Sequence, residues 1–453
     1  MSPKARQILD MNAFDATADG TPADALLARR MSNFGASSVL FYSRPIEMVR
    51  ARGCWMEAAD GTQYLDFYNN VPSVGHCHPG VVEAICDQVR ALNINSRYLH
   101  RTTEAYLERL KASLPAGDWN IALACTGSEA NDLALRAAMR WTGGTGFVVT
   151  ETAYHGNTAA VIEVSPASLK RGKPPSHVRA VPAPSHEAYG GDIAGGFAAE
   201  VKRAIATLKR RGHAFAGLLV DSIFSSDGVF ADPPGFLSEA ARVAKDAGGL
   251  LIADEVQPGF GRTGTMWGFE RHGLAPDIVT MGKPMGNGYP MSGMATRPEI
   301  LARFCEDVGY FNTFGGTPVA SAAGLAVLDA IEADGLMRNA GTTGKYLLDR
   351  LNALAGIEPR LGDVRGAGLF LGIDLVAAGN GAPDPGAAKS LINALRDRRV
   401  LIGAAGRYGH TLKVRPPLCL TTAEADFFVD AMADALGHGG TVAPALASRG
   451  GVG

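Results

Sequence analysis

The 453-residue sequence lacks a long hydrophobic run, an excess of either charge and a dense set of cysteines. No apolar run approaches the roughly 18 residues that cross a bilayer, and the opening residues contain no apolar core of a signal peptide. The 43 basic and 45 acidic side chains nearly cancel, which argues against a nucleic-acid-binding surface or a polybasic membrane patch. We therefore expect a globular cytoplasmic protein that binds neither nucleic acid nor membrane.

The six cysteines form no CxxC pair, so they predict neither a zinc site nor a disulfide framework. His76, Cys77 and His78, in GHCHPG, suggest a metal motif at first sight. However, adjacent side chains in a loop rarely converge on one ion, and no second group of ligands lies nearby in the sequence. The simpler interpretation is a loop that enters a helix at Pro79, and we expect no metal ion.

The pattern of apolar runs predicts an α/β fold. Between residues 75 and 330, near-continuous apolar runs such as GGLLIADEV alternate with amphipathic helical patterns. This alternation is typical of a mostly parallel sheet that helices cover on both faces. The sequence predicts a large domain over 75–330 and a smaller α+β domain assembled from both chain ends, 1–74 and 331–437. The Gly/Ala-rich residues 438–453 are expected to form a disordered tail.

Glycine or polar residues follow three of the expected strands, at the sheet edge where open α/β sheets bind ligands. Gly127 and Ser128 open a helix whose free N–H groups suit one phosphate, although Thr-Gly-Ser is also an ordinary helix cap. Asp254 ends an apolar strand, where a carboxylate needs a hydrogen-bonding or cationic partner. Lys283 ends the next expected strand, in front of a glycine-rich turn.

A phosphate site, a buried carboxylate and a strand-end lysine together fit pyridoxal phosphate (PLP). The lysine forms a Schiff base with this cofactor, the carboxylate keeps the pyridinium nitrogen protonated, and the helix end holds the phosphate. Each element is weak evidence alone, but the three in this order are specific. A nicotinamide dehydrogenase is excluded, because the glycine-rich GGTGF precedes an expected strand instead of following one.

The motifs TGSEAND, YHGNT, ADEVQPGFGRTG, MGKPMGNGYP and FNTFGGTPVA resemble those of the class III aminotransferases, PLP-dependent enzymes of fold type I. The resemblance covers nearly the whole chain. It implies the catalytic residues Lys283, Asp254 and Tyr154. It also implies nine cofactor-binding residues: Gly127, Ser128, Tyr154, His155, Asp254, Val256, Gln257, Lys283 and Thr317.

The resemblance assigns a role to each of these side chains. Tyr154 would stack on one face of the cofactor ring and Val256 on the other, while Gln257 would hydrogen-bond the ring hydroxyl. Thr317 would reach the phosphate of a neighbouring subunit. That last role implies a homodimer with shared active sites, and a tetramer remains possible.

The activity implied by the resemblance is transfer of an amino group from an amine or amino acid to a 2-keto acid. It would follow a ping-pong mechanism through pyridoxamine phosphate, with Lys283 moving the proton. MGKPMGNGYPMSG and LKVRPPLC are most similar to the branch of alanine–glyoxylate aminotransferase-like proteins and amino-alcohol-phosphate phospholyases. Phosphate elimination is therefore the second expectation, and racemisation or epimerisation is the third.

One departure from the family pattern concerns substrate recognition. Asp221-Ser222 stands where many relatives have glutamate and proline, and that glutamate often pairs with a substrate-binding arginine. The usual switch between two substrates is therefore in doubt. An arginine fork suits a carboxylate or a phosphate, although an interdomain salt bridge is an alternative role. Four residues are expected to contact substrate: Tyr68, Asn70, Arg407 and Arg415.

Overall fold

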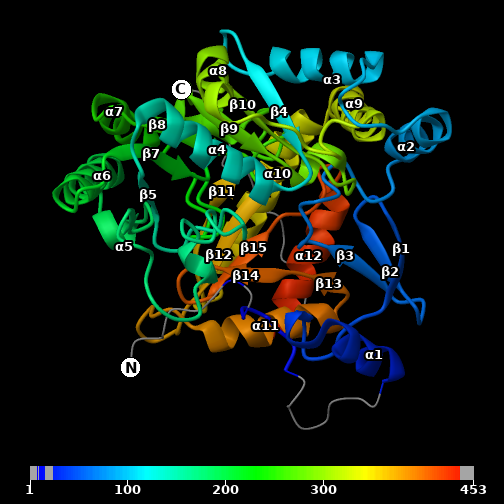
Figure 1. Ribbon diagram of the computed structural model, residues 1–453. Helices are drawn as coiled ribbons and strands as arrows, with labels where there is room; N and C mark the ends of the chain where they lie inside the picture. Colours follow the sequence, from blue (N-terminus) through cyan, green and yellow to red (C-terminus); the bar gives the residue numbers. More distant parts are fainter. Residues whose placement is uncertain (1–7, 9, 16–23, 439–453) are drawn as a thin grey trace, which may run out of the picture.

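The structure, a computed structural model, describes residues 8, 10–15 and 24–438. One seven-stranded sheet and two four-stranded sheets form its framework (Figure 1). Residues 439–453, nearly all of the expected tail, lie outside the described residues.

The seven-stranded sheet is the centre of the large domain. In spatial order its strands are β4 (Asn120–Ala124), β10 (Ser292–Thr296), β9 (Ile278–Met281), β8 (Leu250–Asp254), β7 (Phe215–Val220), β5 (Gly146–Thr150) and β6 (Val178–Val181). β10 is antiparallel to both of its neighbours, and all other neighbouring strands are parallel. The prediction of a mostly parallel sheet is confirmed.

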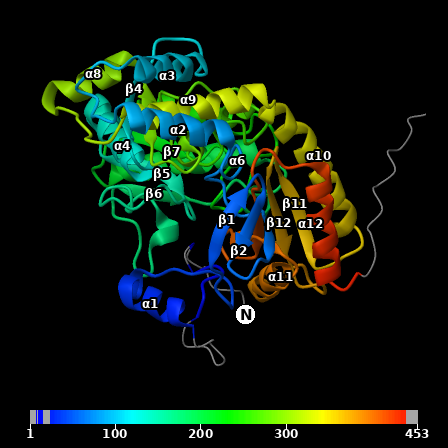
Figure 2. The ribbon, with the colours of Figure 1, turned by 90° about the vertical axis from the view of Figure 1, so that its right-hand side faces the viewer.

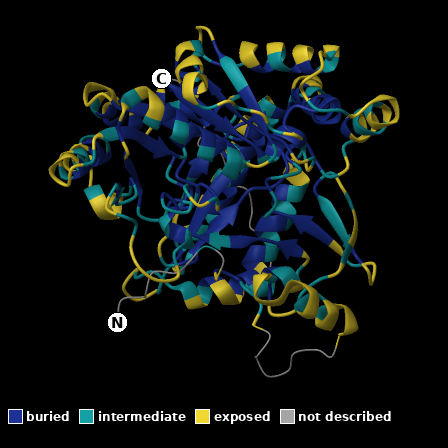
Figure 3. Cartoon of the chain, in the orientation of Figure 1, coloured by how far each residue is buried: buried dark blue, intermediate teal, exposed yellow. Residues whose placement is uncertain are grey.

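Helices bury both faces of this sheet, which explains why its strands are apolar throughout. Phe147 and Val149 of β5 belong to one buried cluster, whereas Val148 belongs to another on the opposite face. The first cluster contains residues of α4 (Gly127–Thr142) and α8 (Pro298–Asp307), and the second contains residues of α6 (Ile193–Arg210) and α7 (Leu237–Asp246). Figure 3 shows the buried sheet between helices with exposed outer faces.

The small domain contains the two four-stranded sheets. The first is formed by β1 (Met48–Arg52), β2 (Trp55–Ala58), β3 (Gln63–Asp66) and β13 (Val400–Leu401). The second is formed by β11 (Leu361–Ala367), β12 (Phe370–Leu375), β15 (Thr411–Val414) and β14 (Gly403–Ala405). Because β13 pairs in parallel with β3, the small domain is built from both chain ends, as predicted (Figure 2). The exact domain boundaries stay a prediction.

The remaining helices surround these sheets and connect the domains. They are α1 (Ala25–Phe34), α2 (Pro79–Ala91), α3 (Arg101–Ala112), α5 (His186–Tyr189), α9 (Pro318–Ala333), α10 (Leu336–Ala355), α11 (Pro385–Asp397) and α12 (Thr422–Ala435). α2 and α3 both pack on α9, and α10 packs on α12. In the part of the chain that the structure describes, no helix is long and apolar enough to span a membrane.

The GHCHPG segment is a loop leading into α2, with Pro79 in the first turn as predicted. Its two histidines point to different acids. His76 Nε2 lies 2.7 Å from an oxygen of Asp66, and His78 Nε2 lies 3.1 Å from an oxygen of Asp334. Among residues 8, 10–15 and 24–438, no group of three or more His, Cys, Asp or Glu side chains is arranged to hold a metal ion.

Candidate active site

The start of α4 forms an open anion cradle at the end of β4. Thr126 caps the helix: its hydroxyl oxygen accepts the Glu129 N–H at 3.2 Å, and the Glu129 carboxylate accepts the Thr126 N–H at 2.8 Å. This cap uses the third helical N–H and leaves those of Gly127 and Ser128 for a ligand. A Cβ atom on Gly127 would lie 2.9 Å from Val256, so only glycine fits between the helix and that side chain.

The loop that carries Tyr154 and His155 packs directly on this cradle. Gly156 has a φ of +139°, and a Cβ there would lie 2.5 Å from the Ser128 hydroxyl oxygen. The Ser128 hydroxyl also donates to the Asn157 side-chain oxygen at 3.1 Å. Glycine at 156 thus lets the backbone come close enough to hold Tyr154 beside the anion cradle.

Asp254 ends β8 and is 5% exposed, and three hydrogen bonds hold its carboxylate in place. One oxygen accepts from His155 Nδ1 at 2.7 Å and from the Asn131 amide at 2.9 Å. The other oxygen accepts the Val256 N–H at 3.1 Å. Sequence reasoning did not select Asn131, although it lies four residues after Gly127 and therefore one helical turn along the same side of α4.

Lys283 follows β9 on a single turn of 3₁₀ helix, Lys283–Gly286. Its φ is +34°, an unusual conformation for a lysine and one found most often where function requires it. Its ammonium group has no hydrogen-bond or ion-pair partner among the described residues. Burial lowers the pKa of Lys283 to about 8, and the nearby Asp254 carboxylate opposes this shift.

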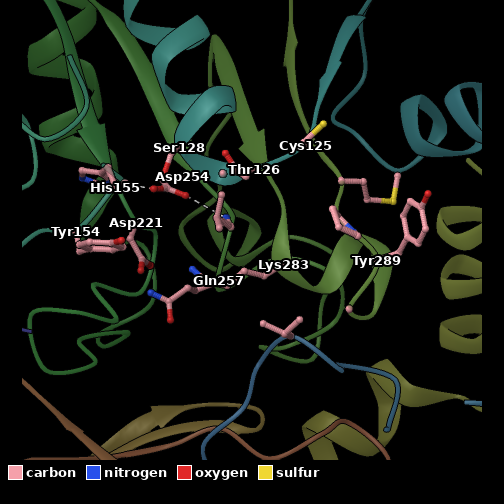
Figure 4. A pocket seen from close by; sticks show the side chains of 17 residues that line it. Cys125, Thr126, Ser128, Tyr154, His155, Asp221, Asp254, Gln257, Lys283 and Tyr289 are labelled. Carbon is pink, nitrogen blue, oxygen red and sulfur yellow. Dashed lines mark hydrogen bonds and ion pairs between the residues drawn. The ribbon is translucent and has the colours of Figure 1, made fainter. Parts of the chain in front are cut away.

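One cavity of about 310 Å³ brings most of the predicted residues together (Figure 4). Eight of the nine predicted cofactor-binding residues line it: Gly127, Ser128, Tyr154, His155, Asp254, Val256, Gln257 and Lys283. Burial raises the pKa of Tyr154, so its hydroxyl stays protonated at neutral pH. Thr317 lies elsewhere, where its hydroxyl caps α9 by accepting the Ala320 N–H at 3.4 Å. Its predicted role at a neighbouring subunit stays a prediction.

The four predicted substrate residues separate into two groups. Asn70 and Arg415 both donate to the Gln257 side-chain oxygen, at 3.2 and 2.8 Å, and the Arg415 guanidinium lies over the Tyr68 ring. These three residues therefore lie directly behind a lining residue of the cavity. Arg407 instead pairs with Glu151 at 2.9 Å and lines a different cavity. Its predicted contact with substrate stays a prediction.

Lys413, which sequence reasoning missed, is the second buried lysine near this cavity. It is 3% exposed and has no hydrogen-bond or ion-pair partner among the described residues. Its strand neighbours on both sides are glycines, Gly372 and Gly403. Alternation along β15 places Lys413 and Arg415 on the same face of the sheet.

Two of the charged groups around Lys413, Lys283 and Asp221, line the same cavity. Burial lowers the pKa of Lys413 well below its usual value, and the positive charges of Arg415 and Lys283 add to that effect. Asp221 and Asp227 oppose it. Among the described residues, neither Lys283 nor Lys413 forms a contact ion pair with these carboxylates.

A strand-end lysine, a fixed carboxylate and a helix-end anion cradle on a mostly parallel sheet define a PLP-dependent enzyme of fold type I. Residues 41–436 match the family described as Aminotransferase class-III, and the chain belongs to that family.

The similar proteins carry names from both parts of the predicted branch, aminotransferases and phospholyases. The chain is 38% identical to an alanine–glyoxylate aminotransferase 2 homolog from Arabidopsis thaliana mitochondria, over 91% of this chain and 87% of the relative. It is 36% identical to an ethanolamine-phosphate phospho-lyase homolog from Caenorhabditis elegans, over 89% and 91%. Among solved structures, a phospholyase from Arthrobacter in complex with phosphoethanolamine has a TM-score of 0.87 and 42% identity, over 91% of this chain and 99% of that one.

The cavity fits PLP, the cofactor of this family. The N–H groups of Gly127 and Ser128 would hold its phosphate, since a side chain at Gly127 or Gly156 would fill that space. Asp254 would face the ring nitrogen, and Lys283 has an amine that no protein group occupies. When bound, PLP supplies an electron-withdrawing ring that makes a substrate C–H bond acidic.

We expect the apoprotein to take up PLP faster as pH rises, with the midpoint of this change near pH 8. The nucleophile is the neutral amine of Lys283, and burial lowers the pKa of that amine to about 8. The neutral fraction therefore increases with pH through that value. The measurement is the growth of visible cofactor absorbance at several pH values. A midpoint near 10.5, the ordinary lysine value, would contradict the assigned environment.

Proposed function

We propose that this class III enzyme eliminates phosphate from an amino-alcohol phosphate such as phosphoethanolamine. The observation that carries the proposal is the buried Lys413, which has no contact ion pair among the described residues, close to Arg415, which contacts the cavity-lining Gln257. A buried ammonium without a counter-charge is unfavourable until an anion binds. The resemblance to the Arthrobacter phospholyase supports phosphate as that anion.

The hydrogen bonds of Asp221 support an anion site at Lys413, because they hold this carboxylate away from a contact ion pair with the lysine. Asp221 lines the cavity, but its oxygens accept hydrogen bonds from Ile223 N–H, Ser225 N–H and the Ser225 hydroxyl. The carboxylate is thus held by its own loop and forms no ion pair with Lys413. A substrate phosphate would not have to displace a protein carboxylate before it bound.

The chain's own residues would divide the reaction as follows. Arg415 and Lys413 would bind the substrate phosphate, and its negative charge would favour the charged form of Lys413. Lys283 Nζ, when neutral, would take the proton from the substrate carbon that carries nitrogen. The carbon–oxygen bond to phosphate would then break, and phosphate would leave with the bonding electrons. With one water, phosphoethanolamine would give acetaldehyde, ammonia and inorganic phosphate.

Transamination to a 2-keto acid is the second candidate. The 38% identity to an aminotransferase favours it, as does Arg415, whose Nε is buried without a partner and could bind a carboxylate. The two reactions separate in one assay of the holoenzyme with phosphoethanolamine and no keto acid. Continuous release of inorganic phosphate would support elimination. No phosphate release, together with amine transfer from alanine to a keto acid, would support transamination and reject our proposal.

Replacing Lys413 with methionine should raise the KM for phosphoethanolamine by about 10- to 100-fold, because one charge-assisted hydrogen bond to the phosphate is lost. The KM for an amine without phosphate should change little. Lys345→Met is the matched control, since Lys345 is an exposed lysine paired with Asp349 on α10. Equal effects of Lys413→Met on both amines would show that Lys413 is not a phosphate contact.

We also propose that the enzyme acts as a homodimer with shared active sites. Three exposed large apolar residues, Tyr98, Leu99 and Phe311, line a second cavity, and Phe314, close to Phe311 in sequence, is also exposed. Thr317 follows this region and would approach the cofactor phosphate of the partner. Light scattering should give twice the chain mass, and a monomeric active enzyme would reject this arrangement. A cytoplasmic location also stays a proposal, because the Arabidopsis relative is mitochondrial.

A further inference from the structure

Two cysteines that are 365 residues apart in sequence lie with their sulfurs 3.7 Å apart. Cys54 is 2% exposed and lies between β1 and β2. Cys419 is half-buried on the segment that connects β15 to α12. The other four cysteines have no sulfur at such a distance among the described residues, and all six are free thiols.

The backbone around Cys54 is fixed on both sides. Gly53 and His76 exchange two hydrogen bonds, at 3.1 and 2.9 Å, in an isolated antiparallel bridge. The Cys54 carbonyl accepts the Asp66 N–H at 2.8 Å. These hydrogen bonds fix the backbone that carries the Cys54 thiol close to Cys419.

The backbone around Cys419 is fixed as well. The Leu418 N–H donates to the Ser73 carbonyl at 2.7 Å. The Asn339 amide donates to the carbonyls of Leu418 and Leu420, at 2.7 and 2.9 Å. Both cysteines are thus positioned for reaction with each other by contacts that involve neither thiol.

The thiol pair is connected to two segments that support the active site: Cys54 contacts the first through its backbone, and Cys419 belongs to the second. Segment 66–76 contains Asn70, which contacts Gln257, and segment 415–419 begins with Arg415, which contacts the same side chain. Buried Arg262 ties the two segments together by donating to the Ser73 hydroxyl and to the Pro416 carbonyl. A change at Cys419 would therefore reach both sets of active-site contacts.

We propose that Cys54 and Cys419 form a reversible disulfide that links the β1–β2 connection to segment 415–419. Of the two, Cys419 is the more accessible and is the nucleophile. The hydrogen bond with Cys54, with a contribution from Arg262, lowers the pKa of Cys419. The same hydrogen bond, with burial, raises the pKa of Cys54. Reactivity of a thiol follows its thiolate fraction and its access to the oxidant.

The oxidant would be a small-molecule disulfide such as glutathione disulfide. The Cys419 thiolate attacks one of its sulfurs, so that a mixed disulfide forms and one thiolate leaves. The Cys54 sulfur then gives its proton to solvent, attacks Cys419 Sγ and expels the second thiolate. Two protein thiols are oxidised and one small disulfide is reduced to two thiols.

The disulfide should have two measurable consequences. It closes a loop of several hundred residues, so the thermal unfolding midpoint of the oxidised protein should rise. A disulfide needs about 2.0 Å between its sulfurs, so Cys419 and the segment that carries Arg415 must move toward Cys54. We expect the KM for any substrate the holoenzyme accepts to rise several-fold on oxidation, and reduction to reverse both changes.

The test incubates the folded holoenzyme with glutathione disulfide, blocks free thiols and maps linked peptides by mass spectrometry. We expect a Cys54–Cys419 peptide that dithiothreitol removes, and a higher unfolding midpoint before that reduction. Cys305→Ser, which changes an exposed cysteine on α8, should behave like the native chain, whereas Cys419→Ser should give no linked peptide and no shift.

The native chain alone also decides the question, even if a variant fails to fold. Alkylation of both Cys54 and Cys419 after oxidation, or a linked peptide that forms only in denaturant, would overturn the proposal. A linked peptide that changes neither the thermal unfolding midpoint nor the KM would also overturn it. Because the peptide and the midpoint do not depend on the reaction catalysed, failure of the proposed phosphate elimination would leave these readouts intact.

Discussion

Replacing Lys283 with alanine should abolish the visible absorbance of the lysine-bound cofactor and lower turnover by at least about 10⁴-fold. Two functions are lost together: the amine that binds PLP covalently and the base that moves the substrate proton. We do not expect Lys413 to replace it, because Lys413 does not line the cavity. Both effects are measured on the purified variant after incubation with PLP.

Two controls make this result specific to the amine of Lys283. Lys283→Arg keeps a positive charge in the cavity but supplies no neutral amine near pH 8, so it should be as inactive as the alanine variant. Lys345→Ala removes an exposed lysine on α10 and should leave absorbance and turnover unchanged. A fully active Lys283→Ala enzyme would reject the assignment of this residue and, with it, the proposed chemistry.

The part of the site that could be predicted lies at the ends of strands. Gly127, Asp254 and Lys283 each follow an apolar run, and neighbouring strands of a mostly parallel sheet bring such ends to one edge. Once the strands and their parallel arrangement are identified, the residues that follow each strand can therefore be predicted to lie close together. β8 and β9 are indeed neighbours, and the cavity contains all three residues.

Lys413 could not be predicted in the same way, because it lies within a strand and not at its end. LKVR predicts that Lys413 and Arg415 share a face of β15, but not which face meets the large domain. That depends on the pairing of β15 with β12 and β14, which place Gly372 and Gly403 opposite Lys413. Sequence reasoning selected Arg407 instead, because nothing near Arg407 in the sequence shows that Glu151 would pair with it.

Asn131 shows a second kind of limit. It stands inside the TGSEAND motif, so the resemblance drew attention to its neighbourhood. Its task became visible only in the structure, where its amide donates both to Asp254 and to the His155 carbonyl at 2.7 Å. Such a residue acts through another, and its contribution depends on side chains from three separate elements.

Replacing Asp254 with asparagine should lower kcat by about 10²- to 10³-fold at saturating PLP, because the cofactor ring loses the negative charge that stabilises its protonated nitrogen. Asparagine keeps the shape of the side chain, but it can accept hydrogen bonds at only one of the two oxygen positions. The contacts from the Asn131 amide and the Val256 N–H, which donate to different oxygens, therefore cannot both persist. The measurement is kcat for phosphate release at PLP concentrations that saturate each variant.

Asn131→Ala separates the charge of Asp254 from its orientation. This variant keeps the carboxylate and its His155 contact but removes one hydrogen bond, so kcat should fall by only about tenfold. If the charge governs the rate, the Asp254→Asn loss must exceed the Asn131→Ala loss by about tenfold or more. Equal losses would mean that Asp254 mainly positions its neighbours. In that case His155, which contacts the same carboxylate oxygen, would become the residue to test as the partner of the ring nitrogen.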